Sequence, residues 1–304
     1  MSVIVLGSIN TDLIVRSTSL PRPGETVIGG QFLQASGGKG ANQAVAAARA
    51  GRSPVTFLAA VGDDLFGQQS LEALRKENLD TSYISVLPGH ASGVALIMVD
   101  AAGENSISVA SGANLALSPA HIDAVPDSVF RQAQVFLASQ ELPLETVEAG
   151  LARAKRFGLT TILNPAPAVP QRQCGNLLAL ADILTPNETE AELITDLRVS
   201  DANSAIAAAR WIEQAGPRGV IITLGSLGAV AVQGSDADII PARKVAAVDA
   251  TGAGDAFSGA LAVALAEGRS FFEAANWATI AASLATTKPG AQPSLPTRQE
   301  IDAQ

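Results

Sequence analysis

The chain has 304 residues, of which 47% are hydrophobic and 16% are charged, and its formal net charge is −9 at pH 7. This composition is typical of a well-packed globular protein, and the sequence contains no apolar run of the roughly 18 residues that a membrane span needs. The acidic balance and the absence of a Lys/Arg cluster argue against nucleic acid as the main partner, because phosphate backbones are bound through basic patches.

Cysteine and histidine are too few for a disulfide or a structural zinc site. The sequence has a single Cys174, expected to be a buried or incidental thiol, and its two histidines are His90 and His121. It opens on a strand-like run, residues 3–6, without the basic segment and apolar core of a signal peptide. We therefore expect a cytoplasmic protein.

Short apolar runs alternate with helical patterns along most of the chain. Buried strands are predicted at residues 2–6, 55–60, 135–138, 160–163, 182–184 and 220–223. Helices are predicted at residues 40–50, 65–77, 144–157, 188–195, 201–214 and 256–265. The alternation predicts a single α/β domain over residues 1–304, with a central, mostly parallel sheet flanked by helices on both faces. Ligands of such sheets bind outside the carboxyl ends of the strands.

Two stretches interrupt this alternation. Residues 26–35 and 92–110 look like exposed strands without adjacent helices, and the second contains a predicted hairpin of residues 93–100 and 106–110. They predict a small separate β-sheet with strands near residues 12–35 and 92–110. This sheet is either a lid over the binding site or a decorated edge of the domain.

Polar side chains follow the first strand and open the first helix. Asn10 and Asp12 lie two apart in an extended segment, so both side chains point the same way and suit adjacent hydroxyls of a polyol. An Asx turn is the alternative. Residues 36–43 combine small residues, which let backbone approach a ligand, with Lys39 and Asn42. The stretch is not a P-loop, because Gly40 follows Lys39 where Ser or Thr is required.

Three later turns each have a structural and a functional interpretation. Asn187 and Glu190 have the spacing of a helix capping box, and their oxygens also suit hydrated Mg²⁺ and nucleotide phosphates. Residues 222–228 form a strand and a glycine turn that either admits an adenine or ribose edge or starts a hairpin. Residues 288–294 offer free carbonyls and the Ser294 hydroxyl to a monovalent cation, or simply end a helix.

Residues 248–259 combine a strand exit with two glycines and a carboxylate at the start of a helix. Gly252 and Gly254 free backbone N–H groups that hold an anion well at a helix N-terminus, with Asp255 beside it. A base next to such a turn suits phosphoryl transfer, whereas an ordinary strand-to-helix turn is the alternative. The stretch is not a dinucleotide fingerprint, because Phe257 stands where the third glycine should be.

Taken together and in this order, these stretches resemble the motifs of the PfkB carbohydrate kinase family, and most closely those of its ribose-phosphorylating members. The motifs that carry the resemblance are residues 7–10, 23–26, 37–44, 164–167, 187–190 and 249–255. The resemblance covers nearly the whole chain. It implies transfer of the γ-phosphoryl group of ATP to the 5-hydroxyl of D-ribose, giving D-ribose 5-phosphate and ADP. It also implies that the small sheet is a lid that pairs with its twin in a homodimer.

The resemblance further implies a role for each matching residue. Asp255 would be the general base, and the N–H groups of Gly252, Ala253 and Gly254 would form an anion hole. The positions that would bind ribose are Asn10, Asp12, Gly38, Lys39, Asn42, Glu141 and Asp255. The nucleotide positions would be Asn187, Thr223, Leu224, Gly225, Ser226, Leu227, Gly228, Gly254 and Thr279. Glu190 would belong to the Mg²⁺ network, and a K⁺ site would be formed by Asp249, Thr251, Ala285, Lys288, Gly290 and Ser294.

The sequence departs from the family pattern at two positions. Pro289 stands where a basic residue is often found, which stiffens the turn but leaves carbonyl ligation possible. Thr279 stands where an Asn or His commonly flanks the adenine, and Asn276, one helical turn earlier, is the other candidate for that contact.

Several other functions compete with ribose phosphorylation. A kinase of the same family acting on deoxyribose, a nucleoside or another sugar is the nearest, although aromatics are only 4% of the chain and a nucleoside site should add stacking surface. A non-catalytic sugar or nucleotide sensor would have no need of Asp255 and its glycines. A nicotinamide-dependent dehydrogenase is disfavoured by the missing fingerprint.

Overall fold

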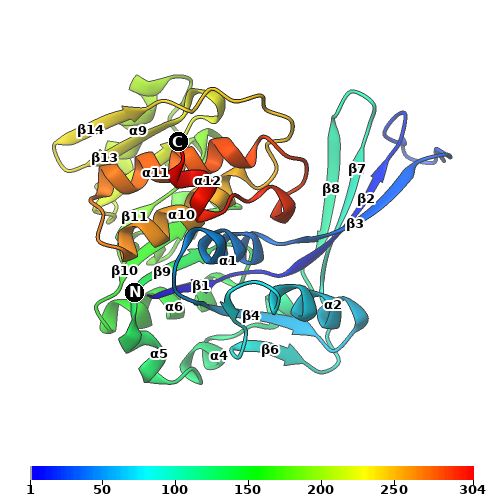
Figure 1. Ribbon diagram of the computed structural model, residues 1–304, viewed down its shortest axis with the longest axis horizontal. Coiled ribbons are helices and arrows are strands. Elements are labelled where there is room, and N and C mark those ends of the chain that lie inside the picture. Colours follow the sequence, from blue (N-terminus) through cyan, green and yellow to red (C-terminus); the bar gives the residue numbers. More distant parts are fainter. Residues whose placement is uncertain (1) are drawn as a thin grey trace.

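A computed structural model describes residues 2–304 and contains a ten-stranded sheet and a separate four-stranded sheet (Figure 1). In the large sheet the strand order is β14-β13-β12-β11-β10-β9-β1-β4-β5, and β6 pairs with β4. The parallel strands are β1 (Ser2–Leu6), β4 (Val55–Gly62), β5 (Leu79–Asp80), β6 (Ile84–Leu87), β9 (Ala133–Ser139), β10 (Thr160–Asn164), β11 (Ile183–Leu184) and β12 (Gly219–Thr223). An antiparallel pair, β13 (Ala229–Gln233) and β14 (Asp236–Ile240), completes one edge.

Helices cover both faces of the large sheet, and alternate residues of each strand serve the two cores. In β1, Val3 and Val5 pack into one core, while Ile4 and Leu6 pack into the other. The first core lies under α1 (Lys39–Ala50), α10 (Ala253–Ala266) and α11 (Phe271–Ala285), with α12 (Arg298–Asp302) beside them. In Figure 1, α1 is blue, α10 and α11 are orange, and α12 is red. The second core lies under α4 (Pro119–Asp123), α5 (Asp127–Gln132), α6 (Leu144–Arg156), α7 (Leu177–Leu180), α8 (Glu188–Thr195) and α9 (Ala202–Glu213).

The strongly apolar helix α10 begins at residues that the sequence places in the site. Nearly all of its side chains are buried because it lies between α1, α11 and the sheet, and a helix that is hydrophobic on all sides is stable only in such a place. No helix within residues 2–304 combines the length and the apolarity that a membrane crossing requires. Cys174 is buried, as expected from the sequence.

The small sheet projects from the body of the molecule at the right of Figure 1. Its strand order is β3-β2-β7-β8, formed by β2 (Asn10–Arg16), β3 (Gln31–Gly37), β7 (Gly93–Val99) and β8 (Asn105–Ala110). The predicted hairpin is confirmed by β7 and β8. The sheet joins the body where Asn10 pairs with Gly37 on one side and with Gly93 on the other.

Most predicted strands agree with the structure to within about two residues at each end, but the start of one lid strand is wrong. Residues 26–35 were predicted as a strand, but β3 begins at Gln31, and residues 26–30 form no strand. Gly29 has a left-handed backbone (φ 99°), which breaks the extended run, and pairing of Gln31 with Arg16 sets where β3 starts. The strands β5, β6 and β14 and the short helices α3 (Ala113–Ala116), α4, α5, α7 and α12 were not predicted, and α11 was expected only as a helix of unstated length before residue 288.

Candidate active site

A cavity of about 210 Å³ lies at the carboxyl ends of the parallel strands. It brings together residues that are far apart in the sequence, from the starts of α1, α8 and α10 and from the ends of β10 and β12. Its lining residues are Lys39, Asn164, Ala166, Thr185, Asn187, Glu190, Thr223, Ala250, Gly252, Gly254, Asp255, Phe257 and Ser258. Seven of the residues proposed from the sequence are among them, namely Lys39, Asn187, Glu190, Thr223, Gly252, Gly254 and Asp255.

Asp255 lies in the first turn of α10 and is only 7% exposed. Asn42 Nδ2 donates to its Oδ2 at 2.9 Å, and Gln43 Nε2 donates to its Oδ1 at 3.1 Å. Burial raises the pKa of this carboxyl to about 6, and the charge of Lys39 together with the two amide hydrogen bonds opposes that rise. Asp255 therefore titrates close to neutral pH, where a general base is most useful.

The turn before Asp255 leaves backbone donors at the start of α10. Gly252 caps the helix with a left-handed backbone (φ 80°) and has no side chain to satisfy the first N–H groups. Ala253 N donates to Ala250 O at 3.2 Å, so this one of the three proposed anion-hole donors is already engaged. A Cβ built on Gly254 would meet nothing within 4 Å, so its Cα faces open space in the cavity. An anion placed there would face a helix N-terminus.

The proposed sugar residues converge where β1, β9 and α1 meet. Glu141 Oε2 accepts hydrogen bonds from Ser8 Oγ and from the backbone N–H of Lys39 (3.0 Å). Asn10 Oδ1 accepts from Asn114 Nδ2 at 2.8 Å. Because Asn114 is 1% exposed and is itself bonded to the backbone of residue 9, it fixes the direction of the Asn10 amide. Asn114 was not proposed from the sequence, where it stands in no motif.

Close backbone packing explains the glycines beside Asp12. A Cβ on Gly37 would stand 2.3 Å from the carboxylate oxygens of Asp12, and a Cβ on Gly38, whose φ is 89°, would stand 2.7 Å from Asn10 N. Burial, followed by the nearby charge of Glu141, raises the pKa of Asp12 to about 6. The structure thus gathers Asn10, Asp12, Gly38, Lys39 and Glu141 on one side of Asp255.

On the other side of Asp255, Asn187 and Glu190 form the predicted capping box of α8. Asn187 Oδ1 accepts from Glu190 N at 2.8 Å, and Glu190 Oε2 accepts from Asn187 N at 2.9 Å. Burial raises the pKa of Glu190, and the bond from Asn187 opposes the rise. These two hydrogen bonds confirm the capping interpretation. Both residues also line the cavity, so the Glu190 carboxylate still lies beside the space for a ligand.

Of the other residues proposed for the nucleotide, Thr223 and Gly254 line this cavity and the rest do not. Gly225–Leu227 form an exposed 3₁₀ turn (η2), Leu224 is buried in the core, and Gly228 packs against the backbone of Ile240. Thr279 is buried in α11 and donates to Ala275 O, whereas Asn276 is exposed.

Asp249 joins the two segments proposed for the cation. Its Oδ1 accepts from Thr251 N (2.9 Å) and Thr251 Oγ1 (2.6 Å), and its Oδ2 accepts from Gly290 N (2.8 Å). Burial acts against ionisation here, but these hydrogen bonds hold the pKa of Asp249 below its ordinary value. The side chain of Lys288 instead pairs with Glu300 at 2.9 Å, and Ser294 Oγ donates to Ala291 O at 2.8 Å.

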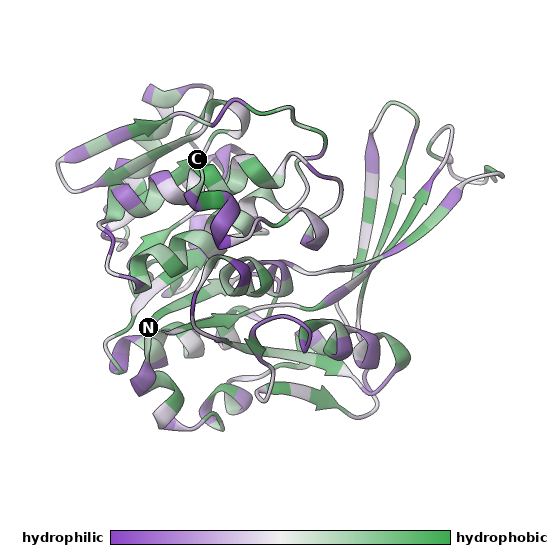
Figure 2. Cartoon of the chain, in the orientation of Figure 1, coloured by the Kyte–Doolittle hydropathy of each residue, from purple (hydrophilic) through white to green (hydrophobic). Residues whose placement is uncertain are grey.

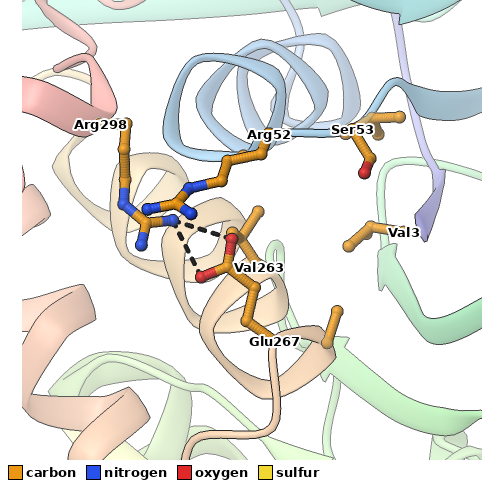
Figure 3. A pocket seen from close by; sticks show the side chains of 9 residues that line it. Val3, Arg52, Ser53, Val263, Glu267 and Arg298 are labelled. Atoms are coloured by element: carbon orange, nitrogen blue, oxygen red, sulfur yellow. Dashed lines mark hydrogen bonds and ion pairs between the residues drawn. The ribbon is translucent and has the colours of Figure 1, made fainter. Parts of the chain in front are cut away.

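A larger cavity, of about 390 Å³, lies at the far end of α10 (Figure 3). Two of the charged side chains in its wall pair with each other: Arg298 Nη1 bonds both oxygens of Glu267 at 2.8 and 2.9 Å, and Arg298 Nε also pairs with Asp302. Arg298 also lies over the ring of Trp277. These contacts tie α12 to α10 and α11, and the cavity contains none of the residues proposed from the sequence.

Comparisons with known proteins agree with this geometry. The family described as pfkB family carbohydrate kinase matches residues 1–298. The chain is 42% identical over 299 residues to a ribokinase of Haemophilus influenzae, covering 98% of this chain and 96% of that protein. It is 36% identical over 302 residues to a deoxyribokinase of Salmonella typhi, covering 99% and 98%. The solved structure of Arabidopsis thaliana ribokinase complexed with ribose and ATP is similar, with a TM-score of 0.89, 32% identity, and coverage of 99% and 97%.

Proposed function

The chain belongs to the pfkB family of carbohydrate kinases, and from that premise we propose that it phosphorylates the 5-hydroxyl of D-ribose with ATP, giving D-ribose 5-phosphate and ADP. The observation that carries the proposal is the position of Asp255. It is a buried carboxylate at an open helix N-terminus, bonded by Asn42 from the group of residues proposed for the sugar, and it shares its cavity with Asn187 and Glu190. We place this reaction in the cytoplasm, where ATP is supplied.

In the proposed reaction, Asp255 takes the proton of the sugar hydroxyl as that oxygen attacks the γ-phosphorus. The bond from the γ-phosphorus to the β–γ bridging oxygen breaks, and its electron pair leaves with ADP. Charge on the transferred group is stabilised by the N–H groups at the start of α10 and by Lys39. Asn42 Oδ1 is a buried oxygen with no partner among residues 2–304, and it suits a hydroxyl donor next to the base.

Mg²⁺ fits the oxygen groups on the nucleotide side. The Glu190 carboxylate and the Asn187 amide line the cavity, and hard cations that retain several waters prefer such ligands. Bound there with the nucleotide, Mg²⁺ would neutralise phosphate charge. No cluster of three or more His, Cys, Asp or Glu side chains suited to a metal occurs within residues 2–304, so the ion would depend on phosphate oxygens and water for its other ligands.

Substrate preference distinguishes ribose from its nearest rival, deoxyribose. We expect ribose to have the highest kcat/KM in a coupled assay that offers ribose, deoxyribose, fructose and adenosine, because the paired Asn10 and Asp12 suit adjacent hydroxyls. Preference for deoxyribose or adenosine would refute the assignment. Binding of sugar and nucleotide without turnover would instead favour the sensor.

Monovalent-cation activation is a separate prediction. Asp249 holds the turns of Thr251 and Gly290 together beside the start of α10, and K⁺ bound to their carbonyls would stiffen the anion hole. We expect a higher rate in K⁺ than in Na⁺ at matched ionic strength, and a smaller difference between the two salts in Asp249→Ala. Equal wild-type rates in the two salts would count against a K⁺ site.

The small sheet, as a lid, offers the surface for a homodimer. Both of its faces carry exposed apolar side chains, among them Phe32 (63% exposed) on one face and Ile107 (55%) on the other, and Figure 2 shows green segments along these strands. We propose that a second copy of this chain covers one face. Analytical ultracentrifugation should then show a dimer that Phe32→Asp or Ile107→Asp dissociates, while Ile239→Asp, an equally exposed position on β14, does not. A monomeric wild type, or a dimer that survives both substitutions, would exclude this interface.

A further inference from the structure

We propose that Gln43 is a positioning residue for the base, and that Asn164 and the carbonyl of Thr185 fix the direction of its amide. The inference rests on the proposed function of Asp255. Gln43 is fully buried in α1, directly after Asn42, and Nε2 of Gln43 donates to Asp255 Oδ1 at 3.1 Å and to Asn164 Oδ1 at 2.9 Å. The two neighbouring amides of α1 thus hold the two oxygens of the carboxylate separately.

A backbone carbonyl determines the direction of this chain of amides. The oxygen of Thr185 only accepts, so Asn164 must direct Nδ2 toward it, which it does at 2.8 Å. That leaves Asn164 Oδ1 facing Gln43, and the amide of Gln43 must then direct its nitrogen toward Asn164. If the Gln43 amide were reversed, its oxygen would face the oxygens of both Asn164 and Asp255. The strand ends of β10 and β11 therefore determine which atom of Gln43 meets the base.

The other half of the Gln43 amide has no structural task. Gln43 Oε1 is buried without a partner among residues 2–304. An unpaired buried amide oxygen costs free energy, and an apolar side chain of similar size would avoid that cost. An apolar side chain could not replace the two hydrogen bonds that Gln43 Nε2 donates, one to Asn164 and one to Asp255. This points to a role at the site rather than in packing.

Removing this donor should affect the ionised form of Asp255 more than the protonated form. The charged groups that face the carboxyl are Lys39 from α1, Glu141 after β9 and Glu190 from α8. Only Lys39 favours ionisation among these three, so the two amide donors support the charged base together with Lys39 and the N-terminus of α10. Without Gln43 the carboxylate also loses its fixed orientation toward the substrate.

The test is the pH profile of Gln43→Leu, measured with ribose and ATP at saturation and below it. We expect kcat to fall about tenfold to a hundredfold, KM for both substrates to change less than about threefold, and the acid limb of kcat/KM to move up by about one pH unit. Thr146→Val is the matched control, because it removes a buried side-chain donor (2.6 Å to Leu117 O) in the other core. It should leave the pH profile of the wild type unchanged.

Asn164→Leu keeps the inference testable if Gln43→Leu does not fold. It should lower kcat and move the acid limb in the same direction, since it frees the Gln43 amide to turn. Where both variants fold, the double variant should be little worse than Gln43→Leu alone, because Asn164 acts through Gln43. An unmoved acid limb, a loss confined to KM, or additive losses would each overturn the inference. A wild type without ribokinase activity would instead overturn the proposed function.

Discussion

Asp255→Asn should abolish phosphoryl transfer while leaving nucleotide binding nearly intact. We expect kcat to fall by roughly 10²- to 10⁴-fold, the contribution of a positioned general base. The asparagine amide cannot take a proton from the sugar hydroxyl, but it occupies the same space in α10. Steady-state kinetics gives the loss in kcat, and calorimetric titration with ADP measures the retained binding.

A matched substitution separates this effect from a general loss of a helix-start carboxylate. Asp201 caps α9, where its Oδ1 accepts from Ser204 N at 2.8 Å, and it lies outside the cavity. Asp201→Asn should therefore retain wild-type kcat. Substantial residual phosphorylation by Asp255→Asn would refute the assignment of Asp255 as the base.

The ionisation of Asp255 also determines how the rate of the wild-type enzyme should change with pH. Since burial raises the pKa of Asp255 to about 6, the ionised base is lost, and the rate falls, as pH decreases through about 6. The contribution of the same group to the free energy of unfolding changes in the opposite direction, because it is larger at low pH. A carboxyl whose pKa is higher in the folded chain than its ordinary value of 3.8 stabilises the fold at low pH, and this contribution is lost as pH rises through about 6.

Gly254→Ala should separate activity from stability. The added methyl group projects into the open part of the cavity at the start of α10, where the transferred group would lie, and we expect kcat to fall about 10²-fold. The fold should not suffer, because alanine is favoured over glycine in a helix by up to about 1 kcal/mol and the methyl meets no atom within 4 Å. Thermal unfolding should give a melting temperature equal to or above that of the wild type.

Gly252→Ala, two residues earlier, is the contrasting variant. Its φ of 80° is strained for alanine, and its Cβ would stand 3.0 Å from Ala291 Cα, so both activity and melting temperature should fall. If Gly254→Ala remained fully active, the space beside Gly254 would not be where the phosphoryl group passes.

The parallel sheet was predictable because each of its longer strands is a short apolar run that can be recognised in the sequence without knowing which strand it pairs with. The small sheet was harder, since its strands are amphipathic and their ends depend on pairing. The pairing of Gln31 with Arg16 determines where β3 begins. Within residues 26–30, only Gly29 and Gly30 argue against a strand. The short helices between Ala113 and Gln132 have too few turns to show a period.

The site was predictable where its residues cluster in motifs and not where it depends on distant contacts. Asn42 and Gln43 reach Asp255 across more than 200 positions of sequence, and only the packing of α1 against α10 brings them there. Gln43 and Asn164 lie inside recognisable motifs, but no periodicity reveals that one amide directs the other. Thr279 and Asn276 differ in burial for a similar reason, because the neighbours of α11 decide which face is covered.

Strand β2 begins at Asn10, among the residues proposed to bind the sugar, and ends in the projecting sheet. Asn10, at its inner end, accepts a hydrogen bond from Asn114, while Val15 and Arg16, at its outer end, are exposed. Because Asn10 is fixed by Asn114, a tilt of the outer part of the strand about Asn10 would displace Asp12 on the sugar side. If two copies of the chain associate through their small sheets, the subunit contact and the position of the sugar-side residues are coupled through this strand. Each sugar bound would then strengthen dimerisation by the same factor by which dimerisation strengthens the binding of that sugar.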